Sequence, residues 1–179
     1  DKSLRKRIEA AYNVTADVGK IAGRVKGRGV SNIEKIEATA GVPIRPALAE
    51  RLPSAEKIIE KLGPRVAVEP KYDGFRIQLH VRKVGKVNKV REVWLFSRNL
   101  ENVTPMFPEI AVAGKKLPLK SGVFDGEAVA YNPKTGVLLP FQDTIQRKRK
   151  HGIEQFAKDM PLKYFVHDIL VLDDKSLLF

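Results

Sequence analysis

The sequence predicts an α+β protein in which a helical N-terminal segment precedes a domain rich in antiparallel strands. Apolar residues recur three or four positions apart as far as about residue 42, the spacing of helices with one buried face. After residue 64 apolar and polar residues alternate, which is typical of half-buried strands. The later helices and strands do not follow the regular alternation of a doubly wound parallel sheet.

The N-terminal segment is predicted to be helical from residue 1 to about residue 42. Gly27-Arg28-Gly29 interrupts its apolar pattern. Ser31, with Glu34 three residues later, forms a capping-box pattern, which predicts a further short helix carrying Ile33 and Ile36.

Two prolines mark a predicted linker after the helical segment. Residues 41–46 read Gly-Val-Pro-Ile-Arg-Pro, and each proline favours an extended conformation in the residue before it. We therefore predict two domains, residues 1–42 and residues 43–179. After the linker, Ser54 is placed to cap a helix that Gly63-Pro64 ends.

The second domain is predicted to contain five strands. They are residues 65–71, 75–82, 93–97, 123–130 and 164–172. Strict alternation from Phe75 to Arg82 makes the second the clearest, with one face buried and one polar, and a polar turn at residues 85–89 follows it. Helices are predicted from Thr104-Pro105 and from Ile153, the latter ending before Pro161.

Composition favours a folded, basic protein with a polyanionic partner. The 179 residues are 43% hydrophobic, and 33 Lys and Arg against 21 Asp and Glu give a net charge of +12. Such a charge attracts nucleic acid, nucleotides or anionic membranes without choosing between them. No apolar run approaches the roughly 20 residues that span a bilayer, and the N-terminus lacks a signal-peptide core, so we expect an intracellular, soluble protein. The absence of cysteine excludes disulfides, thiolate metal sites and thiol catalysis.

The candidate for chemistry is the segment Glu69-Pro70-Lys71-Tyr72-Asp73-Gly74, between two predicted strands. The chain has neither a G-x-x-x-x-G-K-[ST] loop nor a G-x-G-x-x-G fingerprint, so a nucleotide would need another binding device. Glu69 and Lys71 lie two positions apart on an extended segment, so both side chains leave the same face, and Asp73-Gly74 supplies a turn.

An enclosed lysine near other cations, such as Lys71 near Arg76, can lose enough ammonium character to act as a nucleophile. The alternative is a solvated lysine in a turn, because Lys-x-Asp-Gly arises by chance in roughly a few per cent of chains this long. Further polar groups follow or lie within the later predicted strands, where each could face one cleft. They are Ser97-Arg98-Asn99, Asp125-Gly126-Glu127 and His167-Asp168.

In this order the four groups resemble the motifs of the covalent nucleotidyltransferases, which comprise ATP-dependent DNA ligases, RNA ligases and mRNA capping enzymes. The sequence is most similar to the archaeal and eukaryotic-type ATP-dependent DNA ligases, and the resemblance covers nearly the whole chain. It implies an antiparallel-rich nucleotidyltransferase (ATP-grasp-like) adenylation domain. By this resemblance Lys71 is the residue that becomes adenylylated, and Glu69 reads the adenine amino group.

The resemblance implies roles for four further residues. Arg76 would lie beside the AMP and the nick phosphate, and Arg98 would hold phosphate. Glu127 would engage the ribose and help to place the metal ion. His167 stands where the family usually has the phenylalanine that stacks on adenine.

The resemblance also implies the domain organisation. Residues 1–42 resemble the C-terminal helical part of a DNA-binding domain. Residues 43–179 resemble the N-terminal part of an adenylation domain, truncated before the later motifs and the OB-fold. The chain therefore reads as a catalytic-domain fragment that is not competent for full ligation by itself.

The implied activity is the sealing of nicks in duplex DNA, through a lysine-AMP intermediate and an adenylylated 5′-phosphate. ATP is the implied substrate and Mg²⁺ the implied metal ion. The partner is nicked duplex DNA, a sliding clamp is allowed as a second partner, no membrane is involved, and the protein is expected to be a monomer.

Two other functions stay open from the sequence. One is an RNA ligase or capping-type nucleotidyltransferase, against which the helical N-terminal segment argues. The other is a non-catalytic, basic nucleic-acid-binding module in which the lysine motif is incidental. Arg147-Lys148-Arg149-Lys150 is predicted to be a solvated basic loop, with a contact to the DNA backbone as the second interpretation.

Overall fold

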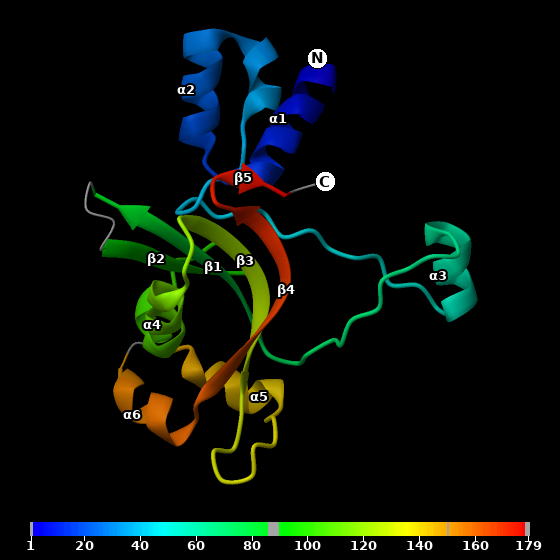
Figure 1. The fold of residues 1–179 in the computed structure, drawn as a ribbon. Coiled ribbons are helices and arrows are strands. Elements are labelled where there is room, and N and C mark those ends of the chain that lie inside the picture. The colour runs from blue at the N-terminus through cyan, green and yellow to red at the C-terminus, as the bar shows by residue number, and fades with distance from the viewer. Residues whose placement is uncertain (1, 86–89, 150, 178–179) are drawn as a thin grey trace.

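The second part of the chain is built around an antiparallel sheet (Figure 1). The structure is a computed structural model that describes residues 2–85, 90–149 and 151–177. Within these residues the strand order is β2-β1-β3-β4-β5, and every neighbouring pair is antiparallel. The strands are β1 (Phe75–Val84), β2 (Val90–Ser97), β3 (Ser121–Ala130), β4 (Leu162–Leu172) and β5 (Lys175–Ser176). The predicted α+β class with an antiparallel sheet is confirmed.

The N-terminal helices form a small cluster at one end of the sheet (Figure 1). They are α1 (Lys2–Val14), α2 (Val18–Arg28) and the 3-10 helix η1 (Val30–Lys35). Their shared core consists of Ala11, Ile21, Ile33 and Ile36. The break at Gly27-Arg28-Gly29 is confirmed, because Gly29 ends α2 with a φ of 78°.

The capping box predicted at Ser31 is wrong. Gly29 precedes η1, no side chain caps that helix, and Glu34 instead accepts a hydrogen bond of 2.7 Å from Nε of Arg7. The ion pair between α1 and η1 takes the carboxylate that a capping box would use. Helix does not extend to residue 42 either, since η1 ends at Lys35.

The start of the predicted linker and the residues just before it lie on the sheet. Ala38, Ala40 and, from the linker, Ile44 are buried against Val123 of β3 and Val171 of β4. Residues 38–44 therefore cover part of one sheet face, with a turn at Gly41 before the two prolines.

The opposite face of the sheet is covered by helix α4 (Pro108–Lys116), which follows the 3-10 helix η2 (Thr104–Met106). The predicted single helix from Thr104 is thus two helices. Their apolar residues pack against inward-facing residues of β1, β2 and β3 to form the main core. Its buried members are Ile77, Leu79, Val81, Leu95, Val103, Phe107, Ile110, Ala111, Phe124 and Ala128.

Helix α3 (Ala55–Leu62) stands away from the sheet on two long coils (Figure 1). Ser54 caps it as predicted, accepting a hydrogen bond from the Lys57 amide, and Gly63 ends it. The strand predicted at residues 65–71 is wrong, because this segment is coil. Pro70 has no N–H to donate, and Val68 is 89% exposed, so neither residue supports pairing with a neighbouring strand.

At the lower end of the sheet in Figure 1 lie α5 (Phe141–Thr144), which contacts β3, then the 3-10 helix η3 (Ile145–Arg147) and α6 (Ile153–Asp159). Only α6 was predicted. The predicted solvated loop is wrong at Arg147, which is fully buried and forms an ion pair with Glu109. Lys150 and residues 86–89 of the predicted polar turn lie outside the described residues.

No helix in the described part of the chain is long and apolar enough to cross a membrane.

Candidate active site

A cleft of about 600 Å³ lies where the sheet face is not covered by residues 38–44. Its walls come from the coil before β1, the start of β1, the loop after β2, and the middle of β3 and β4. Residues 47–49 and the segment that carries Phe141 and Lys148 complete them. All six predicted site residues line the cleft: Glu69, Lys71, Arg76, Arg98, Glu127 and His167. The structure thus brings together side chains that are up to 98 positions apart, from Glu69 to His167.

Two strands hold the charged floor of the cleft. Arg76 lies directly opposite Glu127 in the pairing of β1 with β3. Its guanidinium donates from Nε to Oδ1 of Asp125 at 3.1 Å and from Nη2 to the other oxygen. This hydrogen bonding raises the pKa of Arg76, although burial opposes the rise. Asp125 therefore fixes the direction in which Arg76 enters the cleft.

The carboxylate of Glu127 is half-buried beside His167. Its Oε2 lies 4.0 Å from Nε2 of His167. Burial raises the pKa of Glu127 above its ordinary value, while His167, the Gly74 amide, Arg76 and Lys71 oppose that rise. Lys71 is thus close enough to act electrostatically on Glu127 across the cleft.

The glycines of two motifs are required by packing. A Cβ at Gly74 would stand 2.4 Å from the Ala128 carbonyl oxygen, and one at Gly126 would stand 2.4 Å from that of Phe165. The turn after Lys71 therefore lies directly on β3, and β3 lies directly under a residue of β4. These close contacts set the distance of the lysine motif from Glu127.

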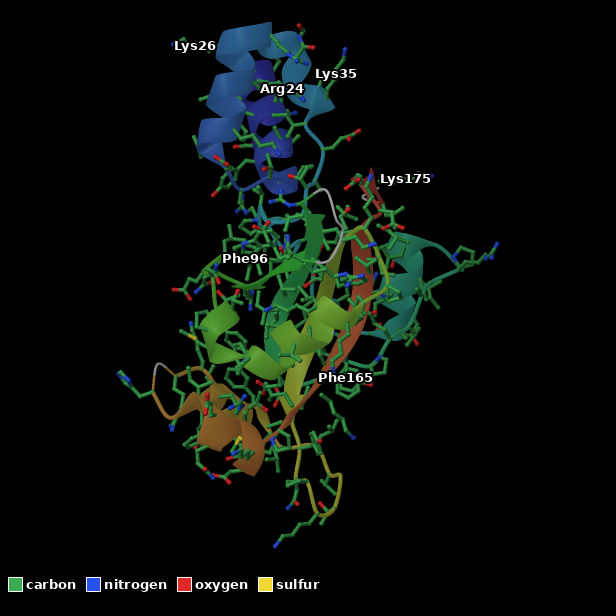
Figure 2. All side chains as sticks on the ribbon, turned by 60° about the vertical axis from the view of Figure 1, so that its left-hand side comes forward. Arg24, Lys26, Lys35, Phe96, Phe165 and Lys175 are labelled. Carbon is green, nitrogen blue, oxygen red and sulfur yellow. The ribbon has the colours of Figure 1, made fainter. Side chains whose placement is uncertain are left out.

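The two residues that follow Lys71, Tyr72 and Asp73, also hold the lysine motif in place. Asp73 accepts a hydrogen bond of 3.3 Å from the Phe141 amide at the start of α5. The ring of Tyr72 stacks on Phe165 of β4, with centroids 3.9 Å apart and an angle of 14° between the planes. Phe165 is labelled in Figure 2. The His167 ring centroid lies 6.2 Å from that of Tyr72.

Lys71 itself is exposed and lies on coil rather than on a strand. Within the described residues no hydrogen bond or ion pair holds its amine. Arg98 is likewise without such a partner, in a tight loop closed by hydrogen bonds from Ser97 N to Glu101 O (2.9 Å) and from Leu100 N to Ser97 O (2.8 Å). Both cations are therefore available to a ligand, whereas Arg76 is already held.

Sequence reasoning missed several residues that line the cleft. These are Ala47, Leu48, Ala49, Phe141 and Lys148. The basic run around Lys148 was a usable signal, but it does not show which of four cations faces the cleft. The three residues after Pro46 carry no pattern that would have marked them.

The cleft offers carboxylates to a metal ion, but no cage made of protein ligands alone appears in the described residues. Among the described residues no group of three or more His, Cys, Asp or Glu side chains is arranged to hold one. Mg²⁺ bound with nucleotide phosphates usually takes only one or two protein carboxylates, because phosphate oxygens and waters complete its shell. Glu127, a carboxylate lining the cleft, fits that requirement.

Comparison with known proteins gives one consistent result. A family model described as "ATP dependent DNA ligase domain" matches residues 46–179. The "DNA ligase 2" of Korarchaeum cryptofilum is 43% identical over 178 residues, which are 99% of this chain and 29% of that protein. The "Probable DNA ligase" of Dictyoglomus thermophilum is 48% identical over 177 residues, which are 98% of this chain and 29% of that protein.

The chain thus spans about 29% of the length of these curated relatives. Among solved structures, the ligase domain from M. tuberculosis LigD is 26% identical with a TM-score of 0.45, over 62% of this chain and 31% of that one.

Proposed function

Because the chain belongs to the family of ATP-dependent DNA ligase domains, we propose that its parent protein seals nicks in duplex DNA through a lysine-AMP intermediate on Lys71. One observation carries the proposal. Lys71, with no partner for its amine among the described residues, lines the same cleft as Arg76, Arg98 and Glu127. An amine nucleophile and phosphate-binding cations are the groups that nucleotidyl transfer needs in one place.

In the first step, the unprotonated Lys71 amine attacks the α-phosphorus of ATP. The nitrogen–phosphorus bond forms, the bond to the bridging oxygen breaks, and pyrophosphate leaves. In the second step, the 5′-phosphate at the nick attacks the same phosphorus and releases the lysine. The 3′-hydroxyl then attacks the adenylylated 5′-phosphate, AMP leaves, and the phosphodiester bond is complete.

The cations of the cleft act on the charge that moves in these steps. Arg76 is held by Asp125, so it faces the phosphates without reorganising when they arrive. Arg98, on a cleft-lining loop closed by its own backbone, is proposed to hold a second phosphate. Such positioned charges supply most of the acceleration in phosphoryl transfer.

The remaining site residues are proposed to bind the nucleoside. Glu69 lines the same cleft as Lys71 and would accept from the adenine amino group. Glu127 would accept from the ribose hydroxyls, which its half-buried position beside His167 favours. His167, near the Tyr72 and Phe165 stack, would lie against the adenine face.

Mg²⁺ is proposed as the metal ion, with Glu127 as its protein ligand. When bound with the nucleotide, the ion would offset negative charge on the phosphates. The protein's own contribution is a carboxylate that Arg76 and Lys71 help to keep charged, since both oppose the burial-driven rise in its pKa.

We also propose that residues 1–42 belong to a helical DNA-binding domain and residues 43–179 to the adenylation domain, which acts as a monomer on nicked duplex DNA. The separate apolar core of the N-terminal helices supports the division. So does the start of the family match at residue 46. The net charge of +12 suits a DNA partner.

The proposal is tested by incubating the parent protein with ATP and Mg²⁺ and weighing it. We expect one AMP adduct that maps to Lys71, is lost on adding nicked DNA as the nick is sealed, and does not form in Lys71→Ala. Lys57→Ala, on the exposed helix α3, is the matched control and keeps the adduct.

Labelling that survives Lys71→Ala would refute the assignment. Labelling by GTP in preference to ATP would indicate a capping-type enzyme, and sealing of RNA but not DNA nicks would indicate an RNA ligase. Tight DNA binding with no adduct would leave a non-catalytic binding module.

A further inference from the structure

We propose that Lys148 binds phosphate oxygens in the cleft, and that Glu101 holds its amine at the cleft wall until a phosphate replaces the carboxylate. The inference rests on the proposed function, because it assigns a further phosphate-binding residue to the same site. The structure shows Lys148 among the cleft-lining residues and shows its amine 2.9 Å from Oε2 of Glu101.

The backbone that presents Lys148 is fixed by the residue before it. Arg147 is fully buried and forms an ion pair with Glu109 of α4. Its Nη1 also donates to the Ile153 carbonyl at 3.4 Å. A guanidinium buried in this way is costly to move, since withdrawing it would leave Glu109 without its partner. Lys148 therefore starts from a defined position.

Two further contacts tie the same segment to the lysine motif and to the sheet. The Phe141 amide, at the start of α5, donates to Asp73, two residues after Lys71. Thr144 accepts a hydrogen bond of 3.0 Å from the Ala130 amide at the end of β3. Residues 141–148 thus form a wall of the cleft that is anchored at both ends.

The side chain of Lys148 reaches inward from this wall. Its Nζ lies 5.7 Å from the centre of the Phe75 ring, at the start of β1 and four residues after Lys71. The side chain is 32% exposed, so its stem is mostly covered while the amine stays accessible from the cleft. An ammonium in this position can contact a phosphate bound between Lys71 and Arg98.

Glu101 closes the loop that carries Arg98, so the ion pair brings the Lys148 amine to the loop that carries Arg98. The Glu101 side chain is 54% exposed, and exposed ion pairs contribute little net stability, so the pair can be exchanged. The hydrogen bond from Lys148 lowers the pKa of Glu101, so the carboxylate stays charged and competes with phosphate for the amine. Lysine suits such an exchange because it binds phosphate as a point charge without fixed geometry.

Two sources can supply the phosphate, namely ATP or the 5′ end of the nick. The test uses the full-length parent protein and measures two steps separately. The first arm measures KM for ATP in forming the Lys71 adduct. The second arm starts from the adenylylated protein and measures the rate of AMP transfer at limiting nicked DNA.

We expect Lys148→Met to raise KM for ATP, or to lower the transfer rate, by about tenfold, the loss of one charged hydrogen bond. Lys148→Arg keeps the charge, so its KM for ATP and its transfer rate should stay close to those of the wild type. Glu101→Gln should change the same step in the opposite direction, by roughly threefold, because it removes the competing carboxylate. Lys158→Met removes the same charge from exposed α6, away from the cleft, and should change neither arm.

A change confined to the first arm assigns Lys148 to the nucleotide, and a change confined to the second assigns it to the nick. The inference is overturned if Lys148→Met matches the wild type in both arms, or if Glu101→Gln shifts the step in the same direction as Lys148→Met. A wild-type protein that forms no adduct would instead contradict the proposed function itself. Thermal melting of each variant separates a folding defect from a loss of binding.

Discussion

The two faces of the sheet are closed in different ways, although they share every strand. One face is covered by α4 through apolar side chains such as Leu79 and Ile110. On the other face, Gln78 accepts from the Ile44 amide at 3.0 Å and donates to the Ile44 carbonyl at 2.7 Å. His80 accepts from the Gly41 amide at 3.2 Å. Beyond these contacts the second face opens into the cleft.

The difference matters for the position of the cleft. Apolar packing is non-directional, so it stabilises the sheet without defining one alignment. Paired hydrogen bonds to both backbone groups of Ile44 allow one alignment only. The coil that continues from Ile44 to the cleft-lining residues 47–49 is thereby fixed in register with β1.

The largest effect is expected from breaking the apolar face. Leu79→Ala should lower the free energy of unfolding by about 2–5 kcal/mol, because the cavity left under α4 cannot be refilled by Gly114. Urea unfolding measures this change. Val137→Ala, at a position 61% exposed, is the control and should stay within about 0.5 kcal/mol. If both substitutions lowered the free energy of unfolding by a similar amount, the face under α4 would not be the main core.

On the polar face, Gln78→Leu should cost about 1–3 kcal/mol for each backbone group of Ile44 left without a partner. Leucine fills most of the same volume but can neither donate nor accept, so both hydrogen bonds to Ile44 are lost. Faster hydrogen exchange of the Ile44 amide would confirm the mechanism. Gln155→Leu, in exposed α6, is the control. An unchanged Ile44 exchange rate in the Gln78 variant would contradict the role given to this contact.

His80 should make the polar face sensitive to acid. Burial lowers its pKa from 6.5 to about 3, so between these values the unfolded chain binds a proton that the folded chain does not. Stability should therefore fall as pH drops through this window, with a slope of up to about 1.4 kcal/mol per pH unit. His80→Asn, measured by urea unfolding at several pH values, should remove that part of the slope. An unaltered slope would show that His80 is not its source.

The smallest effect concerns the open part of the polar face. Asp125→Asn keeps the shape of the side chain but loses its charge, so Arg76 is held less firmly in the cleft. We expect adduct formation to slow by up to about tenfold, equivalent to 1.4 kcal/mol, measured by quenched-flow labelling with ATP. Asp159→Asn, on α6, should leave the rate unchanged. If both variants form the adduct at the wild-type rate, the contact of Asp125 with Arg76 does not contribute to the reaction.

The alternating strand at β1 could be predicted from the sequence, but the burial of its polar side could not. Gln78 and His80 were expected on a polar face, yet both are buried, because residues 41–44 lie over them. Alternation reports which residues can face water. It does not predict that a segment more than thirty positions away will cover polar residues and supply their hydrogen-bond partners.

The six predicted site residues could be assigned to one cleft because their motifs fix both residue types and spacing. Arg147 was not, because its burial depends on Glu109, 38 positions earlier. The coil at residues 65–71 shows the same limit, since an extended segment becomes a strand only where a neighbour offers its backbone groups. The assigned roles of the six site residues stay predictions.

The close backbone contacts at Gly74 and Gly126 restrict how this sequence can diverge. Both positions reject even a methyl group, so a saturation library at either site should return functional clones with glycine alone. Nearby exposed positions such as Lys71 have no such steric limit, and only chemistry would select the residue there. Sequencing the functional clones would therefore distinguish residues required for steric reasons from residues required for reactivity within one short motif.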